Sequence, residues 1–239
     1  MMERVGDSQR QTILGQIRAS LRRGALDLPP QRLIEPTFVP ERARGEAALL
    51  VQRFVQEAEE VETTVHRVAS IEDVPDEVAR YLAAENLPAV LRMAPDHRLS
   101  AIPWARRPTI TVTTGKSDGS DEVGLTGALA GVAETGTLVL HSGPESPTTL
   151  NFLPATHIVV LNIDQIVGAY EQAIAVLRAA GPLPRTINFI TGPSRTADIE
   201  QQLELGAHGP RRLHIVLVDD ASIKPGEEFG SDNCGGGNG

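Results

Sequence analysis

Continuous apolar runs separated by segments of helical spacing constrain the fold of this chain most strongly. Because these runs are uniformly apolar rather than alternating, they indicate strands buried on both faces of a parallel sheet, with helices covering each face. Right-handed crossovers then place the loops that follow the strands at one edge, where such sheets bind ligands. The strands are predicted at 137–141, 157–162, 187–191 and 213–218, and the helices between them at 164–180 and 196–205.

The first half of the chain predicts a similar but less regular succession. Helices are expected at 41–60 and 76–84, and strands at 63–68, 88–93 and 109–113. Residues 1–40 predict a separate arm, made of a helix at 12–23 and a connector with four prolines, which exclude regular helix or sheet. The expected organisation is therefore an arm at 1–40, an α/β domain at 41–220 and a flexible, glycine-rich tail at 221–239.

Composition excludes several classes of function. The formal net charge of −9 argues against a nucleic-acid partner or an anionic membrane, since both need a basic face. The single cysteine, Cys234, excludes a disulfide framework and a self-contained iron–sulfur cluster, which needs about four thiolates. The polar start and the lack of any apolar run near ~18 residues predict a cytoplasmic protein with no membrane span.

The histidines favour no metal site, because no pair has close metal-ligand spacing. His66, His97 and His214 stand in no constellation of functional residues and are expected to be ordinary half-buried side chains.

A segment rich in glycine and alanine, residues 123–137, leads directly into a predicted core strand. Glu134 lies there among apolar neighbours, which makes it a candidate acid, base or nucleophile with a raised pKa. Thr135 and Gly136 beside it are candidate ligand-binding residues. The alternative is a tightly packed turn in which Glu134 only bonds or caps backbone.

A second motif, residues 190–200, leaves a predicted parallel strand, turns at a Gly-Pro pair and opens a predicted helix. This geometry aims free backbone N–H groups at the ligand edge, and Gly192 is a candidate ligand-binding residue there. Ser194 and Thr196 can cap the helix or bond an anion, and Arg195 can clamp a carboxylate or phosphate. Two acidic residues follow and would repel phosphate, which favours a carboxylate or hydroxyl ligand. His141, at the end of another predicted strand, is expected near this edge.

A third motif, residues 205–210, connects the predicted helix at 196–205 to the last strand. His208 titrates near neutrality when unperturbed, so a role in proton transfer is one option. We expect it at the opposite strand end from the 192–196 loop, which favours a structural or interface role.

These segments together resemble the LUD-domain family, and the resemblance covers roughly residues 45–220. It rests on four stretches: 133–138 (AETGTL), the strand entry at Pro154 and His157, the long run 191–200 (TGPSRTADIE), and 206–214. The single-domain branch of lactate utilization protein C is most similar. The resemblance implies a fold of the NagB/RpiA/CoA-transferase group. It also implies a place in a three-protein system that oxidises L-lactate to pyruvate, with iron–sulfur clusters in the partner proteins.

The leading hypothesis is therefore a non-redox subunit of that iron–sulfur-dependent complex, with no cofactor of its own. It would bind a small carboxylate or a nucleotide-like ligand, with Glu134 as acid, base or nucleophile. One alternative is a scaffold that grips the partner subunits, or a second copy of itself, through residues 1–40. Another is a stand-alone enzyme of the same fold group, such as a CoA transferase.

Overall fold

The structure, a computed structural model, describes residues 5–20, 39–197, 203–206 and 208–220. The chain divides into two compact units, residues 1–38 and 39–239, and each is considered by itself. In the first unit, helix α1 (Val5–Ser20) leaves Ile13 56% and Ile17 48% exposed. This helix begins at Val5, whereas the sequence pattern predicted a helix at 12–23. The proline-rich connector and the tail at 221–239 lie outside the described residues.

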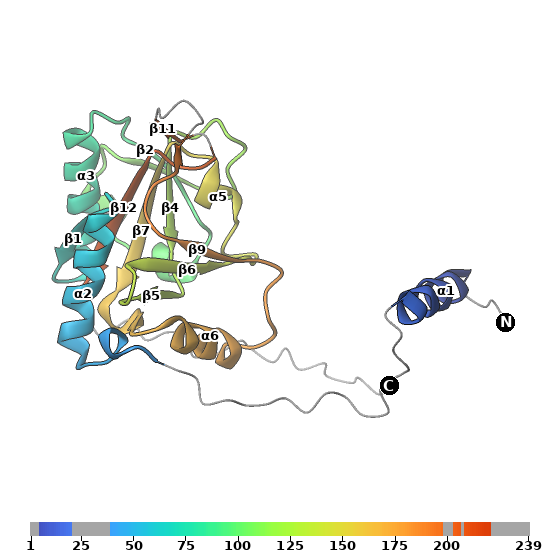
Figure 1. Cartoon of the computed structure of the whole chain (residues 1–239). Helices are drawn as coiled ribbons and strands as arrows, with labels where there is room; N and C mark the ends of the chain where they lie inside the picture. The colour runs from blue at the N-terminus through green and yellow to red at the C-terminus, as the bar shows by residue number, and fades with distance from the viewer. Residues whose placement is uncertain (1–4, 21–38, 198–202, 207, 221–239) are drawn as a thin grey trace, which may run out of the picture. The chain divides into compact units, whose positions relative to one another are not determined.

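A six-stranded parallel sheet forms the centre of the second unit (Figure 1). The strand order is β1-β12-β7-β4-β2-β3, and each neighbouring pair is parallel. This confirms the predicted α/β class with a mostly parallel sheet. The strands are β1 (Thr64–Val68), β2 (Val90–Met93), β3 (Thr111–Thr114), β4 (Val123–Gly127), β7 (Thr156–Asn162) and β12 (Arg212–Val218).

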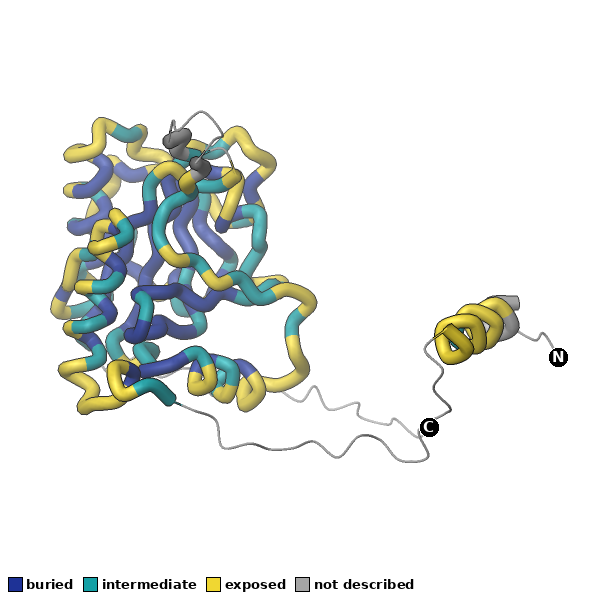
Figure 2. The backbone as a smooth tube through the Cα atoms, in the orientation of Figure 1, coloured by how far each residue is buried: buried dark blue, intermediate teal, exposed yellow. Residues whose placement is uncertain are grey.

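Both faces of this sheet are buried, and the pleat of β12 shows how. Leu213, Ile215 and Leu217 join the core under helix α2 (Ala47–Glu60). Val216 and Val218 point to the other face and pack with helix α3 (Val74–Ala84). Figure 2 shows this interior as dark blue strands. The prediction of helices on both faces is therefore confirmed.

A second, four-stranded sheet crosses below the main one, in the order β8-β5-β6-β9 (Figure 1). It contains β5 (Ala130–Val132), β6 (Thr137–His141), β8 (Ile166–Val167) and β9 (Ile187–Ile190). The strands expected at 137–141 and 187–191 exist, but their expected place in the parallel sheet is wrong, since β6 is antiparallel to both β5 and β9. Only a short turn joins β5 to β6, and such a turn makes consecutive strands antiparallel neighbours.

Two helices expected to be continuous are interrupted where the backbone passes close to other segments. The helix predicted at 164–180 becomes a 3₁₀ turn (Ile163–Gln165), strand β8 and helix α6 (Tyr170–Ala179). Gly168 lies between them, and a Cβ atom there would stand 1.8 Å from the carbonyl oxygen of Ala43. The helix predicted at 41–60 is likewise a 3₁₀ turn (Glu41–Ala43) followed by α2, with Gly45 at a φ of +145° in between.

The helix expected at 196–205 is wrong. The described part of this segment forms antiparallel strands β10 (Arg195–Ala197) and β11 (Leu203–Leu205), and residues 198–202 lie outside the described residues. The Gly206 amide donates to the Ser194 carbonyl at 3.0 Å, which continues the pairing beyond the strands. Hydrogen bonding between β10 and β11 thus takes the place of the i to i+4 backbone hydrogen bonds of the predicted helix.

Short helical elements complete the described fold. They are α4 (His97–Ser100), α5 (Thr149–Phe152) and 3₁₀ turns at Ile71–Asp73 and Trp104–Arg106. No helix in the described ranges has the length and apolarity needed to cross a membrane.

Candidate functional site

Glu134 lies in the turn between β5 and β6, and the turn is closely packed. Its carboxylate accepts hydrogen bonds from the Arg42 guanidinium at 3.0 and 2.9 Å, and its amide donates to the Gly168 carbonyl at 3.0 Å. Gly136 adopts a φ of +62°, and a Cβ there would lie 2.3 Å from the Ala58 nitrogen. The small residues of this motif therefore let the turn approach α2.

Four hydroxyl groups meet beside this turn. Thr137, which is fully buried, bonds to Thr135 at 2.7 Å, to Tyr170 at 2.9 Å and to Thr191 at 2.6 Å. Thr135 also bonds to Tyr170 at 2.9 Å. This hydroxyl cluster joins the first predicted motif to the start of the second. Its members satisfy one another, which stabilises the contact between β6, β9 and α6.

In the second motif, residues 195–197 form strand β10 where the sequence predicted the start of a helix, and residues 198–202 lie outside the described residues. Gly192, at a φ of +85°, packs against Val61. Arg195 forms an ion pair with Glu62 at 2.7 Å and donates to the Val61 carbonyl at 2.9 Å. Of Thr196, only the backbone in β10 is described.

The remaining predicted residues lie elsewhere. His141 ends β6 opposite Ile187, where its ring contacts the Ser142 carbonyl oxygen at 3.4 Å. Ser194 lies against the 206–210 segment, with its amide donating to the Pro210 carbonyl at 2.8 Å and its hydroxyl 3.4 Å from the His208 nitrogen. The expectation that His208 lies at the opposite end from the 192–196 loop is therefore wrong.

Polar groups converge instead at the carboxyl edge of the main sheet, between β2 and β4. The chain continues from β2 to β3 on one side, whereas β4, β7 and β12 follow on the other, so this is the topological switch point. Arg98 donates to Asp96 from Nε and from Nη2, the latter at 2.6 Å. A Cβ on Gly127 would lie 3.1 Å from Asp96 Oδ2, so glycine makes this close approach possible.

Two amide side chains extend this edge cluster. Gln165 donates to the Ala128 carbonyl at 2.7 Å, and Arg98 Nη1 approaches the same oxygen at 3.5 Å. The backbone N–H of Asn162 donates to Gln165 Oε1 at 2.8 Å, and the Asn162 side-chain amide donates to the Asp220 carbonyl. A partly open cavity of about 20 Å³ lies beside this cluster, and it is lined by Arg98, Asn162 and Gln165 together with Gly127, Leu99, Ile71, Val160 and Val218. That volume matches about one water molecule.

Electrostatics keep Asp96 ionised although it is only 5% exposed. Burial raises the pKa of its carboxyl group, but the hydrogen bonds and charge of Arg98 lower it further than burial raises it, and the net shift is downward. The edge cluster thus contains an oriented guanidinium, an ionised carboxylate and amide groups. Such a set can bind a carboxylate through arginine.

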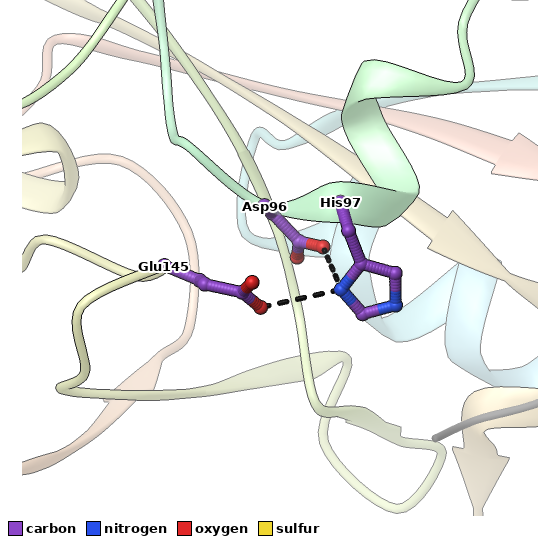
Figure 3. Close-up of side chains that lie close together, drawn as sticks. All are labelled: Asp96, His97 and Glu145. Atoms are coloured by element: carbon purple, nitrogen blue, oxygen red, sulfur yellow. Dashed lines mark hydrogen bonds and ion pairs between the residues drawn. The ribbon is translucent and has the colours of Figure 1, made fainter. Parts of the chain in front are cut away.

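Asp96 also lies beside His97 and Glu145, shown in Figure 3. One ligand atom from each lies within 4.8 Å of the others, and His97 Nδ1 is 3.2 Å from Glu145 Oε2. Both Asp96 oxygens already accept bonds from Arg98, whose positive charge opposes a cation at this place. The His97 side chain is 70% exposed, so the expectation that it is half-buried is wrong.

The structure reveals a buried charge network that the sequence expectations missed. Glu77, 4% exposed, accepts bonds from Arg80 at 2.6 and 2.7 Å and from His214 Nε2 at 3.1 Å. His66 lies 3.3 Å from the same carboxylate. His214 Nδ1 lies 2.8 Å from the Thr64 hydroxyl, and the imidazole stacks on Tyr81 at 3.9 Å.

His214 is therefore part of a constellation, contrary to the sequence expectation. A histidine inside an apolar run buried on both faces needs a polar partner, and that requirement was the available signal. Because ionised Glu77 accepts from Nε2, Nδ1 is left to accept from Thr64. Burial raises the pKa of Glu77, but the bonds from His214 and Arg80 lower it to about 2.

Comparison with known proteins places this chain in a family. The LUD domain model matches residues 51–218. Lactate utilization protein C of Geobacillus kaustophilus (strain HTA426) is 42% identical over 93 residues, which are 37% of this chain and 39% of that protein. Lactate utilization protein C of Bacillus subtilis (strain 168) is 40% identical over 102 residues, 41% of this chain and 42% of that protein.

The matched stretches thus span less than half the length of these curated relatives. A crystal structure of a DUF162 family protein from Deinococcus radiodurans is similar with a TM-score of 0.54 and 23% identity. It covers 73% of this chain and 99% of that one, and supports the fold alone. Because the domain model matches most of the sequence, this chain belongs to the LUD-domain family.

Proposed function

We propose that this protein is a non-redox subunit of a lactate-utilization system whose partner subunits carry the iron–sulfur clusters. Support comes from its similarity to two proteins named lactate utilization protein C. The single cysteine in 239 residues supports the non-redox part, because a cluster is held by about four thiolates.

The ligand proposed for this subunit is a small carboxylate, bound at the edge cluster. The observation that carries this is Arg98, 26% exposed, oriented by Asp96 at the topological switch point of the main sheet. The cavity of about 20 Å³ favours a small carboxylate over a nucleotide-like ligand. A three-carbon acid is larger than this cavity, so the proposal requires the Arg98 guanidinium to move away from the Ala128 carbonyl oxygen, which it meets at 3.5 Å.

Growth on L-lactate tests both the role in lactate utilization and the proposed ligand site at the edge cluster. In a strain that lacks the gene, wild-type protein should restore growth, whereas Arg98→Gln should fail at equal abundance of folded protein. Arg178→Gln on α6, an exposed arginine far along the sequence from the edge cluster, is the matched control. Normal growth of the deletion strain itself refutes the lactate role, and full growth with Arg98→Gln refutes only the ligand site.

The catalytic role expected for Glu134 and the anion role expected for Arg195 remain proposals. Each side chain has a structural partner, Arg42 for Glu134 and Glu62 for Arg195. If Glu134→Gln and Arg195→Ala both support full lactate growth as folded proteins, these roles are removed. A glutamyl-CoA adduct trapped at Glu134 would instead favour the CoA-transferase alternative.

A second candidate function is assembly of the system through helix α1. This helix carries Ile13 and Ile17, spaced to lie on one face and about half exposed, in a unit distinct from the α/β unit. Such a face suits docking on a partner subunit or on a second copy of the chain. Removing residues 1–38 should then abolish co-purification with partner subunits while the α/β unit stays folded, and unchanged assembly excludes this role.

A further inference from the structure

A groove of about 620 Å³ opens at the amino edge of the main sheet, where β7 and β12 begin. It lies at the opposite end of the strands from the edge cluster, since its residues precede β4, β7 and β12 in the chain. Its main side chains are Phe152, Leu153, His208, Arg211 and Arg212. The groove therefore uses the third sequence motif, which the proposed function leaves unexplained.

Backbone hydrogen bonds hold the walls of this groove together. The amides of Arg211 and Arg212 both donate to the Ala155 carbonyl, at 2.8 and 3.2 Å. The Thr156 amide donates to the Glu122 carbonyl at 3.0 Å, which joins the residue before β4 to the start of β7. The groove is thus preformed by the starts of three adjacent strands, which favours binding because little ordering is needed.

Two arginines and one carboxylate line the groove, in a chain of net charge −9. The Arg211 side chain lies over Gly206, where a Cβ would stand 2.2 Å from Arg211 Cγ, and Gly206 has a φ of +83°. Among the residues whose side chains the structure describes, none forms a hydrogen bond or ion pair with the Arg211 guanidinium. Arg212 meets Glu85 through Nε at 3.1 Å, and Glu122 is the one carboxylate in the lining.

Apolar side chains line the same groove as these arginines. Phe152 is 43% exposed and Leu153 is 48% exposed, although both are large apolar residues. The volume lies in the range of about 300 to 1,000 Å³ typical of small-molecule sites. Arg211, whose guanidinium has no partner among the described residues, and the exposed Phe152 line the same groove, which favours a ligand with an anionic group and an apolar part.

We propose that this groove binds a small organic anion with an apolar body. The anionic group pairs with Arg211, and the apolar body covers Phe152 and Leu153. The site is independent of the carboxylate site at the edge cluster, because the two lie at opposite ends of the parallel strands.

The fluorescent probe anilinonaphthalene sulfonate tests this inference on the full chain. It should bind with saturable one-to-one stoichiometry, and Arg211→Gln should weaken it about tenfold, the usual effect of losing a charge-assisted hydrogen bond. Phe152→Ser should also weaken it. Two matched controls, Arg178→Gln and Phe189→Ser, should leave the affinity unchanged, since Phe189 is 45% exposed but lies on β9.

A neutral analogue, phenylnaphthylamine, separates charge pairing from general apolar adsorption. The proposal predicts that it binds more weakly than the sulfonate and does not respond to Arg211→Gln. Equal affinity for both probes, affinity within twofold of wild type in either groove variant, or equal loss in the controls overturns it. Circular dichroism of each variant confirms that the fold is intact.

Discussion

Replacing Glu77 by glutamine removes the charge that holds three basic side chains between α3, β1 and β12. Glu77 is 4% exposed, and its partners are Arg80, His214 and His66. A fall in the pKa of Glu77 from its usual 4.5 to about 2 corresponds to about 3 kcal/mol of unfolding free energy. Because the folded-state pKa is depressed, this stabilisation is complete well above pH 4.5 and is lost as the pH falls toward 2.

Urea unfolding of wild type and Glu77→Gln, followed by circular dichroism, measures this contribution. We expect a difference of about 3 kcal/mol at pH 7 that shrinks to roughly 1 kcal/mol at pH 3. The control Glu72→Gln removes a carboxylate that is 70% exposed and pairs with Arg106. It should change stability by less than about 1 kcal/mol, as exposed ion pairs do. A Glu77→Gln difference below about 1 kcal/mol at pH 7, or one that is equal at both pH values, refutes the reasoning.

Three further predictions concern the packing around the β5–β6 turn and the sheet. Gly136→Ala should destabilise the protein by about 2 kcal/mol or more, because its Cβ would stand 2.3 Å from the Ala58 nitrogen at a φ of +62°; thermal unfolding that matches wild type contradicts this. Thr137→Val should lose about 1 to 3 kcal/mol by removing the centre of the hydroxyl cluster, whereas Thr137→Ser should retain most of the stability in urea titrations. Burial lowers the pKa of His157 to about 3, so its imidazole should stay neutral at pH 5 in NMR titrations, and a protonated ring there contradicts the structure. The unfolded chain binds that proton below about pH 6.5, so this group lowers stability as the pH falls from there.

The parallel sheet was predictable because its signal is local. Strands β7 and β12 are buried along nearly their whole length, and each appears in the sequence as a continuous apolar run. The glycine and alanine segment at 123–137 likewise signalled close packing, and Gly136 shows where its backbone approaches that of α2. What periodicity does not contain is which strands pair, and so β6 and β9 were assigned to the wrong sheet.

The candidate sites were less predictable than the fold. Arg195 was expected to clamp a ligand, but it pairs with Glu62 once β10 replaces the predicted helix. The edge cluster around Arg98 went unnoticed because its members come from three segments far apart in the sequence, at the start of α4, the end of β4 and the end of β7. The position of His208 was mispredicted for a similar reason. The antiparallel pairing of β10 with β11 brings the chain back beside Ser194, so His208 lies next to the 192–196 loop.

The sequence by itself determined the fold class, the acidic surface and the lack of thiolates for a cluster, because these follow from composition and from patterns within one element. Only the tertiary structure decided which polar groups meet. Glu77 and His214 are 137 residues apart, and Arg42 and Glu134 are 92 apart. A buried polar or charged side chain is stable only when its partner is buried beside it. No local sequence pattern specifies which distant residue that partner is. The same holds for the groove at Arg211, whose walls are brought together by strand pairing alone.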